Sequence, residues 1–240
     1  MDAPNQAKVA LRERSVPGLH ASLLESFRRY ATRESSVLDV GCGSGAWAER
    51  LREDGFRSVW CVDNDTAQYK GKSPFSRVDL NGDFPDAVRS AFSMPAFDVI
   101  TTVEVIEHLE NTSAFLRRCA SLLVPSGLLV VTTPNVLCAP SRLKFLLYGN
   151  LRHFDECGDP THISPIFPRL LDRLAQSTGL DLECSLPLPN DSRFNGTSPV
   201  NALVSRLLSG LMRGETKGDC TLFVMKRRET QSNIANESVK

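Results

Sequence analysis

The segment EVIEHL, Glu104 to Leu109, places two carboxylates and an imidazole within five residues. If the backbone turns helically here, Glu104, Glu107 and His108 stand at i, i+3 and i+4 and share one face. Such a group can bind a divalent metal ion, or it can act as a general base with helpers. A strand-to-helix turn without chemistry is the third interpretation, and the rest of the chain has to decide among them.

A second chemical signal is the glycine-rich segment VLDVGCGSGAWAERL, residues 37–51. A β-branched run leads into Gly41, Gly43 and Gly45, and a helical pattern follows. Glycines allow a ligand to lie directly on the backbone, and the helix N-terminus behind them offers unpaired N–H groups. The segment alone is ambiguous, because Gly41, Gly43 and Ala46 also satisfy a dinucleotide-binding fingerprint.

Three carboxylates separate the interpretations of this loop. Asp39 lies two residues before the first glycine, where it would sit badly beside a pyrophosphate but would suit a positively charged ligand. Asp63 ends a second strand, 18 residues after Gly45, where a carboxylate can accept hydrogen bonds from ribose hydroxyls. Asp79 ends a short third strand, where it could meet an adenine amino group.

Strand and helix patterns alternate along the chain with short connections, which predicts an α/β fold with a doubly wound, mostly parallel sheet. The Ser-Pro pair at Ser164 and Pro165 is typical of a helix start, and Gly179 follows the end of that helix. Helices are expected at 18–34, 46–55, 111–127, 164–180 and 198–214, and strands at 36–45, 58–63, 75–80, within 96–109, and at 128–135, 181–188 and 220–227.

The bulk composition limits the function. The 240 residues carry 28 Lys and Arg against 28 Asp and Glu, so no overall charge drives binding to nucleic acid or anionic membranes. No run approaches the roughly 18–20 apolar residues that span a bilayer, and the N-terminus has no signal-peptide pattern. The seven cysteines are scattered without C-x-x-C spacing, which indicates reduced thiols in a cytoplasmic protein.

The predicted domain organisation is a single catalytic domain with loose ends. We expect a loose N-terminus at 1–17, one domain at 18–228, and a disordered tail at 229–240. Within the domain, residues 136–163 lose the regular pattern and form a covering insertion, while 197–214 form a helix between the last two strands.

With these motifs in order, the sequence resembles the class I S-adenosylmethionine-dependent methyltransferases. DVGCGSG, CVDND, VDLNGDFPD, FDVITTVEVIEHL and LLVPSGLLVVTTPN follow one another as that family's motifs do. The resemblance implies a Rossmann-like sheet of seven strands whose last strand runs antiparallel, with S-adenosylmethionine as cofactor. It also implies the cofactor-binding residues, which are Asp39, Gly41, Cys42, Gly43 and Gly45 for the methionyl part, Asp63 and Asn64 for the ribose, Asp79 and Leu80 for the adenine, and Glu104 in the pocket wall.

Within that family, EVIEHL resembles two groups. One is the ubiquinone-biosynthesis O-methyltransferases with the small-molecule and glycan methyltransferases near them. The other is the small-RNA 2′-O-methyltransferases, in which a Glu-x-x-Glu-His group and a distant His bind a divalent metal. That resemblance implies His162 as a possible partner of Glu104, Glu107 and His108. A metal-free base or orienting role for His108, and a structural turn, stay open beside it.

The preferred interpretation is O-methylation of a small-molecule, lipid-linked or sugar acceptor, with His108 and Glu107 as catalytic residues and no metal assigned. Nucleic acid is not the expected partner, and peripheral membrane contact stays open. The insertion is expected to line an aromatic acceptor pocket with Phe145, Tyr148, Phe154, His162 and Phe167. The alternatives are a metal-dependent small-RNA 2′-O-methyltransferase and a non-catalytic partner protein with this fold.

Overall fold

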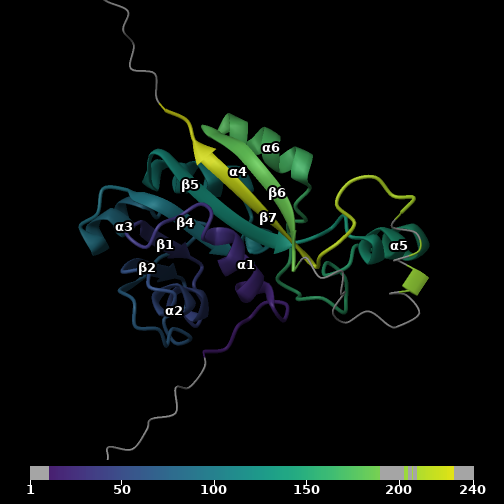
Figure 1. Cartoon of the computed structure of the whole chain (residues 1–240), viewed down its shortest axis with the longest axis horizontal. Helices are drawn as coiled ribbons and strands as arrows, with labels where there is room; N and C mark the ends of the chain where they lie inside the picture. The colour runs from purple at the N-terminus through teal and green to yellow at the C-terminus, as the bar shows by residue number, and fades with distance from the viewer. Residues whose placement is uncertain (1–10, 190–202, 205–206, 208–209, 230–240) are drawn as a thin grey trace, which may run out of the picture.

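A seven-stranded sheet forms the centre of the molecule. The computed structural model describes residues 11–189, 203–204, 207 and 210–229. The strands are β1 Ser36–Val40, β2 Ser58–Asp63, β3 Phe75–Arg77, β4 Phe97–Val103, β5 Leu123–Pro134, β6 Leu180–Leu188 and β7 Cys220–Arg227. Their order in the sheet is β3-β2-β1-β4-β5-β7-β6 (Figure 1). All strand pairs from β3 to β5 are parallel, and β7 runs antiparallel to both β5 and β6, which confirms the predicted fold class.

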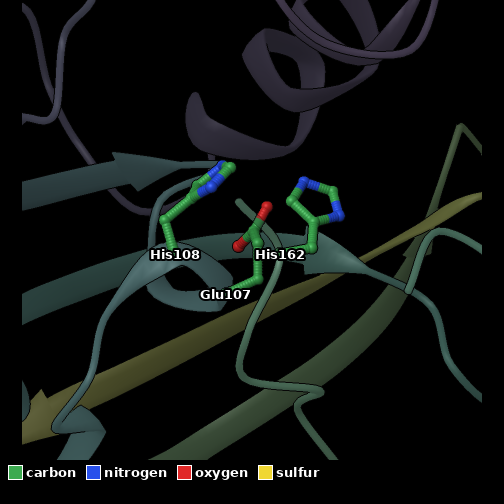
Figure 2. A group of neighbouring side chains, drawn as sticks. All are labelled: Glu107, His108 and His162. Carbon is green, nitrogen blue, oxygen red and sulfur yellow. The ribbon is translucent and has the colours of Figure 1, made fainter. Parts of the chain in front are cut away.

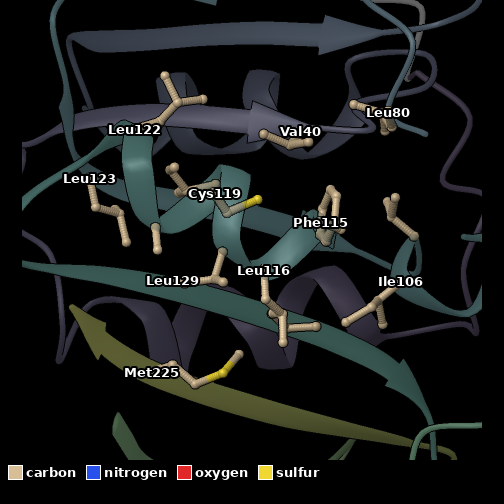
Figure 3. Close-up of a cluster of buried hydrophobic side chains, with 14 of the residues drawn as sticks. Val40, Leu80, Ile106, Phe115, Leu116, Cys119, Leu122, Leu123, Leu129 and Met225 are labelled. Atoms are coloured by element: carbon tan, nitrogen blue, oxygen red, sulfur yellow. The ribbon is translucent and has the colours of Figure 1, made fainter. Parts of the chain in front are cut away.

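Helices cover both faces of this sheet. They are α1 Leu19–Phe27, α2 Ala46–Glu53, α3 Pro85–Phe92, α4 Thr112–Leu122, α5 Ala139–Tyr148 and α6 Pro168–Ser177. Because side chains alternate along a strand, Leu38 and Val40 pack in the cluster that contains α3, α4 and α6. Val37 faces the other cluster, which contains α1 and α2. Figure 3 shows the first cluster, in which Phe115 and Leu116 of α4 lie against the sheet.

The strand order creates the place where a ligand can bind. β1 and β4 are neighbours, and the chain continues outward from them in opposite directions. In an open parallel sheet such a reversal leaves a crevice beyond the carboxyl ends of the two strands. The glycine loop follows β1 and EVIEHL follows β4, so the two motifs meet at this crevice.

Several element boundaries differ from the sequence prediction. β3 ends at Arg77 instead of residue 80, and α1 ends at Phe27 instead of residue 34. The predicted N-cap Ser164 is wrong, since α6 begins at Pro168 after the cap residue Phe167. Ser164 is instead tied to EVIEHL, because its backbone N–H donates to the Glu107 carbonyl oxygen at 2.9 Å.

Two helices were not predicted. α3 buries only Pro85 and Val88, so it has no apolar period long enough to identify it by pattern. α5 lies inside the segment 136–163, where the mixture of aromatic, Gly and Pro residues hid its helical character. Of the predicted helix 198–214, residues 203, 204 and 207 are helical and residues 210–214 are not, while its other residues lie outside the described ones.

The insertion is anchored beside the start of β7. Arg152 forms a buried ion pair with Asp219, and the Ala139 backbone N–H donates to the Thr216 carbonyl oxygen at 2.9 Å. α5 itself projects away from the sheet, as Figure 1 shows. In the described parts of the chain, no helix is long and apolar enough to cross a bilayer.

Candidate active site

Residues 41–44 of the glycine loop line a cavity. Gly41, Gly43 and Gly45 have φ angles of 77°, 53° and 84°, in the left-handed region that favours glycine. A Cβ on Gly41 would lie 2.4 Å from Val105 Cγ2, so this glycine also lets EVIEHL pack directly on the loop. A Cβ on Gly43 would meet no atom within 4 Å, so Gly43 faces open space.

Asp63 connects the second strand to this loop. Its Oδ2 accepts a hydrogen bond from the Gly43 N–H at 2.8 Å, and its Oδ1 accepts one from the Asp65 N–H at 3.0 Å. The carboxylate therefore fixes the loop conformation and also lies in the wall of the cavity. Asn64 lines the same wall.

Asp39 is a buried carboxylate that lacks part of its hydrogen bonding. Its Oδ1 accepts from the Thr101 hydroxyl at 3.0 Å, while Oδ2 has no partner among the described residues. Burial raises the pKa of Asp39 to about 7. An unsatisfied buried carboxylate oxygen at a cavity wall fits a ligand that carries positive charge, as the sulfonium and ammonium groups of S-adenosylmethionine do.

The adenine-side residues lie differently from the prediction. Asp79 does not end a strand, because β3 stops two residues earlier; its Oδ1 accepts from the Asn81 N–H at 3.0 Å in a turn. Asp79 and Leu80 still line the cavity, whose volume is about 740 Å³. Residues 11–17, which the sequence predicted to be loose, also reach this cavity, since the Ser44 hydroxyl donates to the Arg12 carbonyl oxygen at 2.9 Å.

Glu104 does not share a face with the other groups of EVIEHL. Its φ angle of 55° turns the chain out of the strand before the 3₁₀ turn η1 Ile106–His108 begins. Its Oε2 lies 3.3 Å from the Cys220 thiol, which donates to it, and burial raises the pKa of Glu104 to about 7. The i, i+3, i+4 arrangement expected for a regular helical turn is therefore wrong at Glu104, although this residue lines the cavity as predicted.

Glu107 is fully buried behind the cavity wall. Its Oε2 accepts from the Thr133 hydroxyl at 3.0 Å, and its Oε1 has no partner among the described residues. Burial first, and then the charge of Glu104, raise the pKa of Glu107 well above its usual range. The Glu107 carbonyl oxygen also accepts from the Ile163 and Ser164 N–H groups at 2.9 Å, which brings the insertion against EVIEHL.

The insertion places His162 beside this carboxylate. The rings of His108 and His162 have centroids 4.7 Å apart, and Figure 2 shows the Glu107 carboxylate between them. One ligand atom from each of the three residues lies within 4.8 Å of the others. Two imidazoles and a carboxylate suit a divalent ion, and the unpartnered Glu107 Oε1 fits that use. Burial lowers the pKa of His108, which favours the neutral ring that either a base or a metal ligand requires.

The aromatic acceptor wall expected in the insertion is not formed as predicted. Phe145 and Tyr148 are exposed on α5, with 56% and 73% of their surface accessible, and Phe154 and Phe167 do not line the cavity. Of the five residues expected there, only His162 does. The wall comes instead from polar residues of the loop 153–162, because that loop turns back toward EVIEHL while α5 points away.

The fold also brings to the cavity residues that the sequence did not indicate. Asp159 and Thr161 could have been noticed, since Asp-Pro-Thr is typical of a turn in which Asp accepts from the N–H two residues later; that bond is 2.9 Å long. His153, Asp219 and Cys220 carry no local signal, because they reach the cavity only through tertiary structure.

These features define a class of protein. A doubly wound sheet with an antiparallel β7, a glycine loop after β1 and carboxylates at the ends of β1 and β2 is the architecture of the S-adenosylmethionine-dependent methyltransferases. The sequence matches the methyltransferase domain family over residues 12–185, so the chain belongs to that family.

Individual relatives agree with this assignment. The chain is 33% identical to the ubiquinone biosynthesis O-methyltransferase of Bradyrhizobium diazoefficiens over 100 residues and 36% identical to that of Caulobacter sp. (strain K31) over 104 residues. Each match covers 41% of this chain and 40% of the relative. A methyltransferase structure from Archaeoglobus fulgidus has a TM-score of 0.59 at 20% identity, covers 87% of this chain and 92% of its own, and shares the fold. Neither the RNA alternative nor the non-catalytic alternative is favoured by these similarities.

Proposed function

We propose that this methyltransferase methylates an oxygen atom of a small-molecule, lipid-linked or sugar acceptor. The observation that carries the proposal is the group of His108 and His162, which line the same cavity as the glycine loop, with Glu107 buried directly behind them. A hydroxyl acceptor must lose a proton during methyl transfer, whereas a carboxylate acceptor needs no base. Two O-methyltransferases among the relatives, which match part of this chain, support the same acceptor atom.

The cofactor-binding part of the proposal uses the residues around the glycine loop. When bound, S-adenosylmethionine supplies the methyl group in activated sulfonium form. The Asp39 carboxylate and the buried Glu104 carboxylate would offset its positive charge, and Asp63 would orient the ribose while it holds the loop. The proposed cofactor-binding residues are Asp39, Gly41, Cys42, Gly43, Gly45, Asp63, Asn64, Asp79, Leu80 and Glu104.

The catalytic part of the proposal assigns His108 and Glu107. His108 takes the proton of the acceptor hydroxyl on its Nε2, since its Nδ1 is engaged by Thr161 at 2.8 Å. Its pKa, which burial lowers, keeps the ring neutral before the reaction. The positive charge that forms on His108 favours the ionised form of the nearby Glu107, whose pKa burial raises, and the resulting ion pair stabilises the imidazolium.

A metal-assisted form of the same reaction has one specific observation in its favour, the 4.8 Å grouping. Glu107, His108 and His162 would hold the divalent ion, which would lower the pKa of the acceptor hydroxyl as a Lewis acid. Metal analysis of the purified protein and of a His162→Ala variant tests this form. Activity that survives exhaustive chelation, with no bound metal in either protein, would contradict it.

The acceptor is found by labelling. Purified protein is incubated with methyl-labelled S-adenosylmethionine and fractionated cell extract, and the labelled product is assigned to small molecule, lipid, glycan, RNA or protein. We expect label on an oxygen atom of a non-nucleic-acid product. Label in RNA, or on nitrogen or carbon, would contradict the proposal, and the cytoplasmic location and the possible membrane contact stay predictions alongside it.

A further inference from the structure

The hydrogen bonds around His108 determine which of its nitrogens carries the proton. Its Nδ1 lies 2.8 Å from the Thr161 hydroxyl oxygen and 3.2 Å from the Thr161 carbonyl oxygen. A carbonyl oxygen can only accept a hydrogen bond. The Thr161 hydroxyl proton is directed to Asp159 Oδ1 at 2.6 Å, so the hydroxyl oxygen is left to accept as well. Both contacts therefore require a proton on Nδ1 of His108.

Asp159 is suited to keep the hydroxyl in that orientation. Its Oδ1 also accepts from the Thr161 backbone N–H at 2.9 Å. Hydrogen bonds from the Thr161 side chain and backbone hold the pKa of Asp159 below its usual range, so this group is an ionised acceptor at neutral pH. A chain of hydrogen bonds therefore runs from His108 Nδ1 through the Thr161 hydroxyl to the Asp159 carboxylate.

His162 is held in the same way by the backbone. Its Nδ1 lies 2.8 Å from the His153 carbonyl oxygen, which again can only accept. His153 has a φ angle of 71°, which a non-glycine residue rarely adopts, and a Cβ on Gly158 would lie 2.5 Å from that same carbonyl oxygen. The tight loop 153–158 thus fixes the direction in which the His153 carbonyl points.

We propose that Thr161 and Asp159 are positioning residues that, together with the His153 carbonyl, lock both imidazoles in the tautomer with the proton on Nδ1. The Nε2 lone pairs of His108 and His162 are then available, and neither atom has a hydrogen-bond partner within the described chain. Any use of these rings in methyl transfer, as base or as ligand, needs a free nitrogen. The inference rests on the proposed function only in taking Nε2 as the working atom.

Nuclear magnetic resonance tests the tautomers directly. The chain has four histidines, so long-range ¹H–¹⁵N correlations of histidine-labelled protein can be assigned with single His→Gln variants. We expect Nδ1-protonated rings for His108 and His162 in the unsubstituted protein. Thr161→Val and Asp159→Asn should raise the Nε2-protonated share of His108, since the longer 3.2 Å contact with the residue 161 carbonyl oxygen alone then favours Nδ1, and both should leave His162 unchanged. Thr161→Ser should keep the original state.

Kinetics then test whether the tautomer matters. Thr161→Val should lower kcat about 10- to 100-fold with little change in KM for S-adenosylmethionine, and Thr161→Ser should restore it. An Nε2-protonated His108 in the unsubstituted protein, or a tautomer that neither variant changes, would overturn the proposal. If a variant changes the His108 tautomer but leaves kcat unchanged, the tautomer assignment stands and the positioning role of Thr161 and Asp159 in catalysis is overturned. If no oxygen acceptor is found, the proposed function fails, while the resonance experiment still decides the tautomers.

Discussion

The two halves of the cavity are built in different ways. On the proposed cofactor side, Asp39, the glycine loop and Asp63 lie within 25 consecutive residues, at the ends of two adjacent parallel strands. On the acceptor side, EVIEHL meets His162 from the insertion and Cys220 from β7, more than 50 and more than 110 residues away along the chain. The cofactor side is therefore set by local motifs, and the acceptor side by the way distant segments pack.

The difference between the two halves of the cavity is tested most strongly at Glu107. Glu107→Gln keeps the size of the buried side chain but can neither carry charge nor serve as an anionic ligand. We expect kcat to fall about 10²- to 10⁴-fold while S-adenosylmethionine affinity, measured by calorimetry, stays nearly unchanged. Glu110→Gln, on an exposed neighbour, is the matched control. An equal loss of cofactor affinity would mean that Glu107 belongs to the cofactor half.

The contact between the two halves lies at Gly41 and Val105. Gly41→Ala places a Cβ against Val105 and forces a left-handed alanine, so the free energy of unfolding should fall by about 2–5 kcal/mol in urea titrations. The double variant Gly41→Ala/Val105→Ala should recover the part of the lost free energy of unfolding that comes from the clash with Val105. Gly43→Ala, which meets no neighbour, should cost only about 1 kcal/mol. Equal losses at both glycines would show that the Val105 contact does not matter.

The cofactor half alone is probed at Asp63. Asp63→Ala removes the acceptor of the Gly43 and Asp65 N–H groups and the proposed ribose contact. Calorimetric affinity for S-adenosylmethionine should weaken roughly 10- to 100-fold, which corresponds to the loss of one or two hydrogen bonds to a charged group. Asp86→Ala, whose side chain is 95% exposed, serves as control. Unchanged affinity would rule out the assigned role of Asp63.

The smallest expected effect is a pH dependence. Because the pKa of Asp39 is raised to about 7, its carboxyl is protonated in a growing fraction of molecules as the pH falls below 7. A cationic cofactor prefers the ionised form, so its affinity should rise about five- to tenfold from pH 6 to pH 7.5, with proton release on binding. Asp39→Asn should weaken this pH dependence of the affinity. Glu104→Gln should remove the part of it that comes from Glu104, whose pKa is also about 7. A flat profile in the unsubstituted protein would contradict the charge pairing.

Prediction from the sequence succeeded where the chemistry is local. The strands β2 and β7 were placed at their observed bounds, and the glycine loop was placed between β1 and α2, because hydrophobic runs and glycines act through neighbouring residues. It failed where tertiary contacts override local preference. The sequence around Ser164 predicts a helix cap, but the Ser164 N–H instead donates a hydrogen bond to the Glu107 carbonyl oxygen. The aromatic side chains of α5 are exposed and do not reach the cavity.

The sequence by itself determined the fold class and the family and predicted the cofactor side of the site, since each of these depends on short motifs and on strand periodicity. Only the tertiary structure decided the surroundings of EVIEHL. It turned Glu104 toward Cys220, placed His162 beside Glu107 and His108, and put Thr161 and Asp159 behind the His108 ring. The physical reason is that side chains separated by more than 50 residues meet through packing and backbone hydrogen bonds, which no local pattern records.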